Sequence, residues 1–312
     1  MTSRRKASTL SLFDLQRMFP TEESIIEYME QIRWGDNLHC VKCGATDRIT
    51  KQKQRKKGYW CGDCRSYFNA YTGTPLEHNR IRDQRTWIYA SYLLMTARKG
   101  ISALQLRREL NISYKAAWYM LHRLRIACGG NMKVLKGEVE LDESYLGGKE
   151  ANKHESGKLR QGRGAVGKTT VLGMRERGGD VKAMVIDKPS QNEIHPKVHE
   201  NIEYGSTLYT DEHKGYDGLD RVFYSQGRVN HSVKEFVNQM AHTNSIESVW
   251  AVIKRGYNGT YHNWSVKHCQ AYINEFSFRL NQGNVKRDTK NRLDSLFRGM
   301  LGKKVTYAAL TS

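Results

Sequence analysis

The spacing of apolar and polar positions divides the chain into a helical front part and a back part in which strands and helices alternate. A first helix begins after the capping residue Thr21, where apolar residues recur at helical spacing from Ile25 onward. Residues 83–127 have helical periodicity too, and a glycine-containing break at 129–131 ends this part. Strands are expected at 137–146, 166–176, 180–187, 206–211 and near 221–225, and helices near 191–203, from 245 and from 265.

Four of the six cysteines lie in two tight pairs, Cys40-Val-Lys-Cys43 and Cys61-Gly-Asp-Cys64, separated by seventeen residues. Four thiolates from two such turns close a tetrahedral shell, which is typical of a structural zinc site, so we expect one zinc ion here. Two disulfides or a redox pair are the alternative, although no βαβ pattern surrounds either pair. The other two cysteines have no such spacing and are expected to be small buried side chains.

The charge balance narrows the possible partners. With 51 Lys and Arg against 32 Asp and Glu, the net charge is +19, an excess that favours a polyanion such as nucleic acid. A ribosomal or a membrane-surface protein is the alternative on charge alone. The chain has no run of about 18 apolar residues and no apolar signal segment near its start, so we expect no membrane span and a cytoplasmic, nucleoid-associated protein.

A helix over 102–110, a turn at 111–112 and a second helix capped by Ser113 predict a helix-turn-helix. In this motif the second helix enters the major groove of double-stranded DNA, whereas an ordinary helical hairpin is the alternative. Basic residues between the cysteine pairs, and a basic stretch near 149–168, are also expected to contact DNA. The candidate DNA-binding residues are Lys53, Arg55, Lys56, Lys57, Tyr114, Lys115, Tyr119, His122, Arg123, Lys153, His154, Arg163 and Lys168.

These patterns predict a multidomain chain that joins small N-terminal domains to one larger α/β domain. The front part is expected to combine a small zinc ribbon with an all-α helix-turn-helix, and the back part to contain a mixed five-stranded sheet. The expected segments are an N-terminal helical segment at 1–35, the zinc ribbon at 36–75, the helix-turn-helix at 76–130, the α/β domain at 131–282 and a basic C-terminal tail at 283–312.

Residues 162–169 match the P-loop pattern of nucleotide-binding proteins. A functional P-loop requires a strand before it and a helix after it, so that backbone amides surround the phosphates. Here the preceding stretch is polar and the following one is expected to be a strand. We therefore expect no bound nucleotide and a basic arm that grips DNA instead, and an ATPase stays as an alternative.

Three acidic residues stand in distinctive positions. Asp142 alternates with apolar residues, as expected on a half-buried strand, and Asp211 ends a second strand. Glu247 lies on an expected helix, with Lys254 two turns later on the same face. Phosphodiester cleavage requires an activated nucleophile and a stabilised leaving oxygen, and two Mg²⁺ (or Mn²⁺) ions held by carboxylates supply both. Lys254 is expected to hold a phosphate nearby.

Other acids compete for these roles, because three of 32 acidic residues can be chosen in many ways and most acids lie on the surface. Glu140 lies two residues before Asp142 and Glu143 directly after it, and Asn244 precedes Glu247 by one turn. All three stay open as alternative or supporting residues.

The order of the expected elements, β-β-β-α-β-α, with acids on the first strand, the fourth strand and a late helix, resembles the ribonuclease-H fold of DDE recombinases. Several segments also resemble bacterial insertion-sequence transposases of the ISXO-like group, which carry a zinc ribbon before a DDE domain. These segments are FPTEESIIEYMEQIRWGD, CVKCG, CGDC, ELDESYLGGKEANKH, LYTDEHKGY, HTNSIESVWAVIKRGYNGTYH and NEFSFRLN, between residue 19 and about residue 281.

The resemblance implies that Asp142, Asp211 and Glu247 are catalytic and that Lys254 assists them. It further implies a DNA transposase that binds terminal inverted repeats, cleaves their ends and transfers them to target DNA, as a homodimer or a higher synaptic oligomer. A catalytically inactive or domesticated DNA-binding regulator is the main alternative. A ribonuclease or junction resolvase of the same fold is another.

Overall fold

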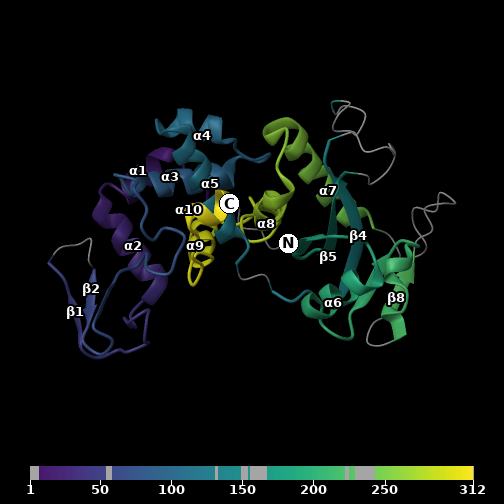
Figure 1. Cartoon of the computed structure of the whole chain (residues 1–312), viewed down its shortest axis with the longest axis horizontal. Coiled ribbons are helices and arrows are strands. Elements are labelled where there is room, and N and C mark those ends of the chain that lie inside the picture. The colour runs from purple at the N-terminus through teal and green to yellow at the C-terminus, as the bar shows by residue number, and fades with distance from the viewer. Residues whose placement is uncertain are drawn as a thin grey trace, which may run out of the picture. The chain divides into compact units, whose positions relative to one another are not determined.

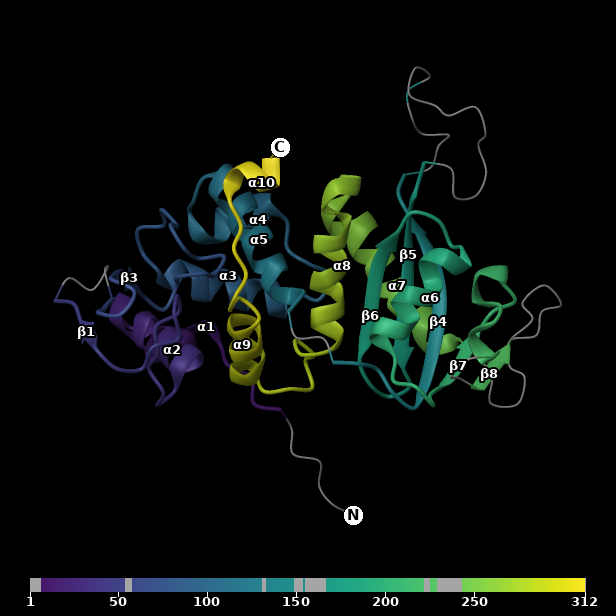
Figure 2. The ribbon, with the colours of Figure 1, turned by 60° about the horizontal axis from the view of Figure 1, so that its bottom comes forward.

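The computed structural model describes residues 7–53, 58–130, 133–148, 154, 167–221, 225–228 and 243–311. The chain forms two compact units (Figures 1 and 2). The first unit comprises Met1–Gly130 together with Gln282–Ser312, and the second comprises Asn131–Asn281. Within the described residues, every helix is too short or too polar to span a lipid bilayer.

The first unit begins with two helices and a small sheet. Helix α1 (Leu12–Met18) and helix α2 (Glu22–Trp34) both start with a capping box. In this motif the side chain of the capping residue accepts the backbone N–H three residues later, and the side chain of that later residue accepts the backbone N–H of the capping residue. Strands β1 (Ile49–Lys51), β2 (Tyr59–Cys61) and β3 (Ser66–Phe68) form an antiparallel sheet in that order. Trp34 at the end of α2 packs edge-on against Tyr59 and Phe68, which anchors the sheet to the helix.

The rest of the first unit is helical. Helix α3 (Arg85–Thr96) precedes α4 (Ala103–Leu110) and α5 (Tyr114–Cys128). Ser102 and Ser113 cap α4 and α5 through their hydroxyl oxygens, and Asn111 takes the left-handed conformation in the turn between them, with φ of 49°. The local geometry is therefore the helix, turn and helix that the sequence predicts.

The C-terminal residues form a structured part of the first unit, and the expectation of a basic tail at 283–312 is wrong. Helix α9 (Thr289–Arg298) buries Leu293, Leu296 and Phe297 and contacts α2, α3 and α5. Helix α10 (Tyr307–Thr311) follows it along the chain. Three apolar positions at helical spacing are enough to bury one face of α9, although basic and polar residues dominate its sequence.

The second unit is built on a mixed sheet with the order β6-β5-β4-β7-β8. The central strand β4 (Glu138–Leu146) pairs antiparallel with β5 (Thr169–Glu176), which pairs antiparallel with β6 (Val181–Ile186). On its other side, β4 pairs parallel with β7 (Thr207–Thr210), which pairs parallel with β8 (Ser225–Arg228). The carboxyl ends of β4, β7 and β8 therefore lie at one edge of the sheet.

Helices cover both faces of this sheet (Figure 2). Helix α6 (Gln191–Asn201) lies on one face, where Ile194 and Val198 pack with Leu141 and Leu172. Helices α7 (Asn244–Gly256) and α8 (Val266–Leu280) lie on the opposite face, with Trp250 in their core. Alternating residues of β4 thus point to different layers, as the alternation around Asp142 predicts. A π-helical turn, Tyr257–Tyr261, continues α7.

Candidate functional site

The pairing of β4 with β7 brings Asp142 and Asp211 to the same edge of the sheet. In the parallel register Glu140 is the partner of Tyr209. Asp142 lies two residues after Glu140, and Asp211 lies two residues after Tyr209. Asp142 is still within β4, whereas Asp211 directly follows the last residue of β7. Neighbouring parallel strands thus present two carboxylates side by side, where α/β proteins commonly form their sites.

The charges of three carboxylates, Asp142, Glu143 and Asp211, interact with one another. The pKa of Asp142 is raised to about 7, chiefly by burial and also by the negative charges of Glu143 and Asp211, while a hydrogen bond from Trp250 acts in the opposite direction. Burial also raises the pKa of Glu143, to which the charge of Asp211 again contributes. Buried carboxylates with raised pKa values beside another negative charge are typical of sites that bind cations or transfer protons.

Glu143 extends toward the opposite face of the sheet from Asp142. The hydroxyl of Tyr216, which is fully buried, donates a hydrogen bond to Glu143 Oε2. The ring nitrogen Nδ1 of His213 lies 3.8 Å from Glu143 Oε1, and the backbone N–H of His213 donates to Asp211 Oδ1 over 3.0 Å. The segment after β7 therefore holds both Asp211 and Glu143 in place.

Glu140, one of the competing acids, has a structural role instead. Its carboxylate is fully buried, and Oε2 accepts the backbone N–H groups of Ser245 and Ile246, each at 2.9 Å. Oε1 accepts Arg177 Nε at 3.0 Å. A carboxylate in this position caps the first turn of α7 and neutralises the partial positive charge of the helix end. Since both oxygens are engaged inside the protein, Glu140 is a poor candidate for a metal ligand.

Glu247 and Lys254 lie on the exposed surface of α7, as does Asn244. Trp250 follows Glu247 by one turn of α7, and its indole N–H donates a hydrogen bond to Asp142 Oδ2 over 2.8 Å. Helix α7 thus contacts Asp142 through Trp250, whereas the Glu247 side chain is exposed. In the part of the chain that is described, the cysteines alone form a group of three or more potential ligands close enough to share an ion.

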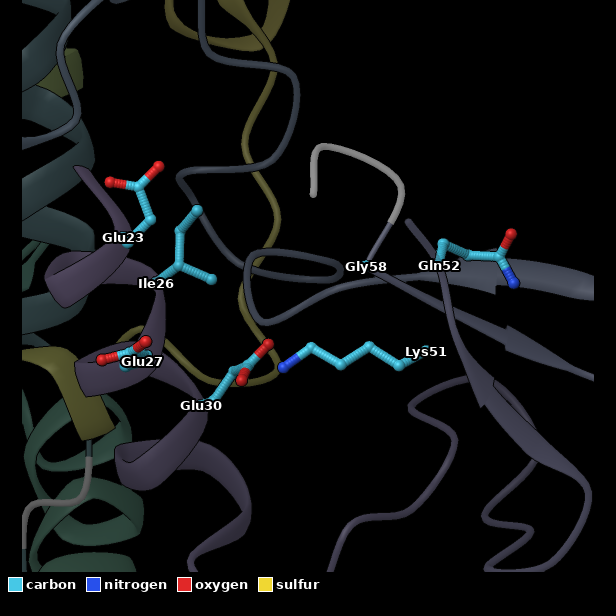
Figure 3. Close-up of a pocket in the computed structure, with 7 residues that line it drawn as sticks. All are labelled: Glu23, Ile26, Glu27, Glu30, Lys51, Gln52 and Gly58. Carbon is cyan, nitrogen blue, oxygen red and sulfur yellow. The ribbon is translucent and has the colours of Figure 1, made fainter. Parts of the chain in front are cut away.

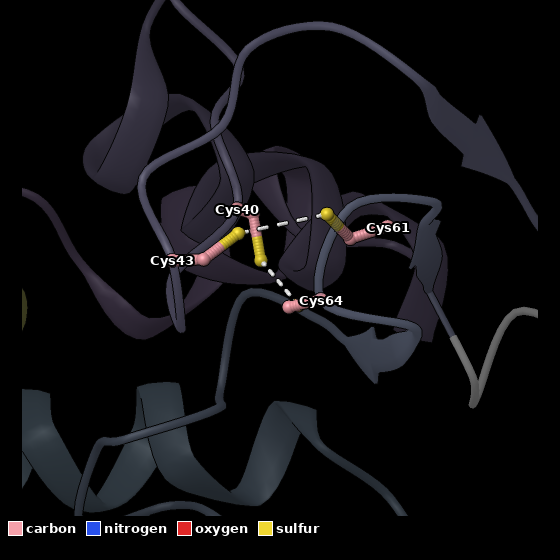
Figure 4. A group of neighbouring side chains, drawn as sticks. All are labelled: Cys40, Cys43, Cys61 and Cys64. Carbon is pink, nitrogen blue, oxygen red and sulfur yellow. Dashed lines mark hydrogen bonds between the residues drawn. The ribbon is translucent and has the colours of Figure 1, made fainter.

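The four paired cysteines meet at one point in the first unit (Figure 4). Their sulfur atoms lie within 4.8 Å of one another, with 3.6 Å between those of Cys40 and Cys64 and 3.7 Å between those of Cys43 and Cys61. A tetrahedral shell with zinc–sulfur bonds of about 2.3 Å requires sulfur–sulfur distances of about 3.8 Å. Burial raises the pKa of Cys40, but hydrogen bonds from the backbone of Lys42 and Cys43, together with those from the Cys43 and Cys64 side chains, outweigh it and lower this pKa to about 7. The donor set and its spacing fit one zinc ion.

Two of the expected DNA-binding residues of α5 are buried. His122 is 1% exposed and Arg123 is 4% exposed, which contradicts the expectation that they face a groove. Helices α3, α4 and α9 surround α5, and the Arg123 guanidinium packs over the rings of Tyr119 and Trp87. The sequence pattern treated residues 283–312 as a tail, so it did not predict that α9 packs against α5.

The other DNA-binding candidates differ in how far the structure describes them. Tyr114 and Lys115 at the start of α5 are exposed, as are Lys53 and His154, while Tyr119 and Lys168 are partly buried. Tyr307 of α10 packs against Tyr119 and Lys115. Arg55, Lys56, Lys57, Lys153 and Arg163 lie outside the described residues.

The P-loop pattern lacks the helix that it requires. Strand β5 begins at Thr169, directly after Lys168, so a strand follows this motif. Residues 162–166 lie outside the described part of the chain. The predicted strand after the motif is confirmed.

A shallow pocket in the first unit is acidic rather than basic (Figure 3). The side chain of Lys51 extends from β1 toward the carboxylates of α2. Negative charge at this position disfavours phosphate, so the pocket is no candidate for DNA contact. Its lining residues are Glu23, Ile26, Glu27, Glu30, Lys51, Gln52 and Gly58.

Sequence reasoning missed the residues that support the acids. Trp250 has an apolar position on α7, which indicated core packing and gave no sign of its contact with Asp142. Tyr216 lies in the segment LYTDEHKGY, which drew attention for Asp211 alone. The capping role of Glu140 depends on residues more than 100 positions away, and no local pattern signals it.

Comparison with known proteins identifies both parts of the chain. Residues 134–281 match the ISXO2-like transposase domain family, and residues 20–66 match the transposase zinc-ribbon domain family. A relative described as an uncharacterized protein in transposable element ISH50 of Halobacterium salinarum is 29% identical over 84% of this chain and 92% of its own length. An uncharacterized transposase-like protein of Haemophilus influenzae is 28% identical over 34% of this chain and 85% of its own length.

Among solved structures, a chain of the simian T-cell lymphotropic virus intasome in complex with PP2A regulatory subunit B56 gamma matches at 10% identity. The TM-score is 0.29, over 61% of this chain and 67% of that chain, which is too low to support a structural argument. The two matched domains, in contrast, contain both the cysteine group and the acidic strand ends described above. The chain therefore combines a transposase zinc-ribbon domain with an ISXO2-like transposase domain, and its relative is a protein of a transposable element.

Proposed function

We propose that this protein binds the terminal inverted repeats of its own insertion sequence, cleaves the DNA strands there and transfers them to target DNA. The observation that carries the proposal is the placement of Asp142 and Asp211 at the ends of two neighbouring parallel strands, inside a transposase domain. Two such carboxylates on rigid strands suit the binding of divalent cations at a fixed position.

The fold supports this proposal. The second unit has the connectivity β-β-β-α-β, followed by a further strand and by helix α7, and its sheet order places the first strand at the centre. We infer a ribonuclease-H-like fold from this order. In this arrangement the central strand, its parallel neighbour and a late helix each contribute an acid, which here are Asp142, Asp211 and Glu247.

The carboxylates fit a hard divalent cation. The negative charges of Glu143 and Asp211 raise the pKa of Asp142, that of Asp211 raises the pKa of Glu143, and a positive ion among them would relieve this repulsion. We propose that Asp142, Asp211 and Glu247 hold two Mg²⁺ or Mn²⁺ ions, which would supply an activated nucleophile and a stabilised leaving oxygen. Lys254, on the same exposed helix surface as Glu247, would bind a phosphate of the DNA as a point charge.

The first unit would bind DNA. The exposed start of α5, with Tyr114 and Lys115, is the part of a helix-turn-helix that meets base edges. Lys53 on the ribbon and the net charge of +19 would add contacts to phosphates. Simultaneous binding of two element ends would require a homodimer or a larger assembly, which sedimentation of the DNA complex tests.

The experiment uses full-length, zinc-loaded protein and DNA from the ends of the element that encodes it. Wild-type protein should bind these ends and cut them in the presence of Mg²⁺. Asp142→Asn and Asp211→Asn should bind with unchanged affinity and cleave at least about 100-fold more slowly, because each loses a charged ligand. Asp187→Asn, an exposed acid after β6, is the matched control and should cleave normally.

The same assay identifies the third acid. If Glu247 is the ligand, Glu247→Gln should abolish cleavage, whereas loss with Glu143→Gln and not with Glu247→Gln would assign the role to Glu143. Binding of the ends without any metal-dependent cleavage by the wild-type protein would overturn the proposed enzyme and leave a DNA-binding regulator.

A further inference from the structure

Helix α7 is fixed to the sheet at three points along its length. At its start, Glu140 of β4 binds the backbone N–H groups of the first turn. Beside it, Arg175 of β5 donates through Nη1 to the Ser245 carbonyl at 3.1 Å and to Ser248 Oγ at 3.2 Å. One turn further, Trp250 reaches Asp142. These polar contacts set the position of α7 along β4, which apolar packing alone would leave less well defined.

A glycine makes the contact between Trp250 and Asp142 possible. Gly173 of β5 is the direct partner of Asp142 in the antiparallel register. A Cβ atom at Gly173 would lie 2.5 Å from Cζ2 of Trp250 and 2.9 Å from Cδ1 of Ile246. The six-membered ring of Trp250 therefore occupies the space that a side chain would fill, and the indole nitrogen then faces the carboxylate on the neighbouring strand.

Both oxygens of Asp142 are oriented by a donor and both retain acceptor capacity. Trp250 Nε1–H binds Oδ2 at 2.8 Å, and the backbone N–H of Glu143 binds Oδ1 at 2.9 Å. An ionised carboxylate has about four acceptor directions, so two stay available after these bonds form. Trp250 is 4% exposed, and its ring is held in the core between α7 and the sheet.

We propose that Trp250 is a positioning residue that sets the orientation of the Asp142 carboxylate for binding a divalent cation. The inference rests on the proposed function, since it assigns the cation to Asp142. A metal ligand that a hydrogen-bond donor already holds in place loses less conformational freedom when the ion binds. Removal of such a donor commonly changes metal affinity or activity by about 10- to 100-fold. The indole N–H of Trp250 orients the Asp142 carboxylate, whereas the ring itself packs in the core.

The two contributions are separated by substitution. Trp250→Phe removes the N–H donor and retains an aromatic ring, while Trp264→Phe changes a tryptophan of the same core cluster that no described contact joins to Asp142. Gly173→Ala retains the indole and displaces it from Asp142 through its new Cβ. Mn²⁺ binding is measured by calorimetry on the full-length, zinc-loaded chain, with and without element-end DNA, and cleavage is measured on the same preparations.

We expect Trp250→Phe and Gly173→Ala to weaken Mn²⁺ binding by about tenfold or more. Both should also raise the Mn²⁺ concentration needed for half-maximal cleavage, with unchanged affinity for the DNA. Trp264→Phe should match the wild-type protein in both respects. Asp142→Asn should lose the site, and retention of the wild-type Mn²⁺ site by this variant would overturn the proposed function. Loss of the site in Asp142→Asn combined with wild-type Mn²⁺ affinity in folded Trp250→Phe would overturn the positioning role alone.

Discussion

The anchoring of α7 by Glu140 leads to a quantitative prediction for the variant Glu140→Gln. Glutamine has nearly the same shape, but its amide offers one acceptor oxygen and a donor group in place of two acceptor oxygens. The variant must therefore leave either the N–H groups of Ser245 and Ile246 or the Nε–H of Arg177 without an acceptor. It also removes the negative charge at the positive end of α7.

The expected cost follows from these contacts. A hydrogen bond that involves a charged group contributes about 1.5–3 kcal/mol, and removal of one partner from a buried ion pair costs about 3–5 kcal/mol. Because glutamine preserves part of the interaction, we expect the free energy of unfolding of the second unit to fall by about 2–4 kcal/mol. For a domain of this size each kcal/mol lowers Tm by about 2–4 °C, so the total is roughly 4–16 °C.

The measurement is thermal unfolding of the full chain combined with hydrogen exchange of the α7 amides, which should lose protection in the first turn. Glu138→Gln is the matched control, since Glu138 lies 3.6 Å from the same Arg177 but its side chain is 43% exposed. An exposed pair of this kind contributes at most about 1 kcal/mol. Equal stability of Glu140→Gln and Glu138→Gln, with unchanged exchange in α7, would refute the capping role.

Two further predictions concern the metal sites. Chelation of zinc, or the substitution Cys43→Ser, should remove hydrogen-exchange protection from β1, β2 and β3, because four thiolates hold this small sheet together. The second unit should keep its protection. Strands that stay protected after complete chelation would contradict this prediction. In metal-free protein the pKa of Asp142 is raised from its usual 3.8 to about 7. The folded state therefore binds this proton more tightly than the unfolded state does, and the free energy of unfolding decreases as pH rises through 7. Asp142→Asn should therefore be more stable than the wild-type protein at pH 8, by up to about 4 kcal/mol, and close to it in stability at pH 4. Denaturant unfolding at both pH values measures this difference. Equal stability at pH 8 would contradict the burial of the Asp142 carboxylate beside other negative charges.

Much of the architecture follows from local patterns. Alternation around Asp142 predicted a strand with Glu140 and Asp142 on one face, and both side chains do face α7. Ser102 and Ser113 marked the starts of two helices, because a hydroxyl at a helix start satisfies backbone N–H groups within three residues. The cysteine pairs predicted their own meeting point, since two turns of fixed spacing leave few ways to arrange four sulfur atoms.

Features that depend on contacts distant in sequence were not predictable in this way. Packing of α9 against α5 joins residues more than 150 positions apart. His122 and Arg123, which a helical pattern places on the polar side of α5, are buried in the folded unit. For the same reason, the sequence left Glu140 and Glu143 as competitors of the chosen acids, which included Glu247. Only the fold shows that Glu140 caps a helix, that Glu143 accompanies Asp142 and Asp211, and that Glu247 lies on an exposed surface.

We propose that the strand ends carrying Asp142 and Asp211 bind divalent cations. Anomalous diffraction from crystals of the zinc-loaded protein soaked in Mn²⁺ at pH 8, recorded on both sides of the manganese edge, tests it directly. We expect manganese bound to carboxylate oxygens of Asp142 and Asp211, and zinc at the four cysteines. Fully occupied manganese elsewhere, with none at these two carboxylates, would contradict the account.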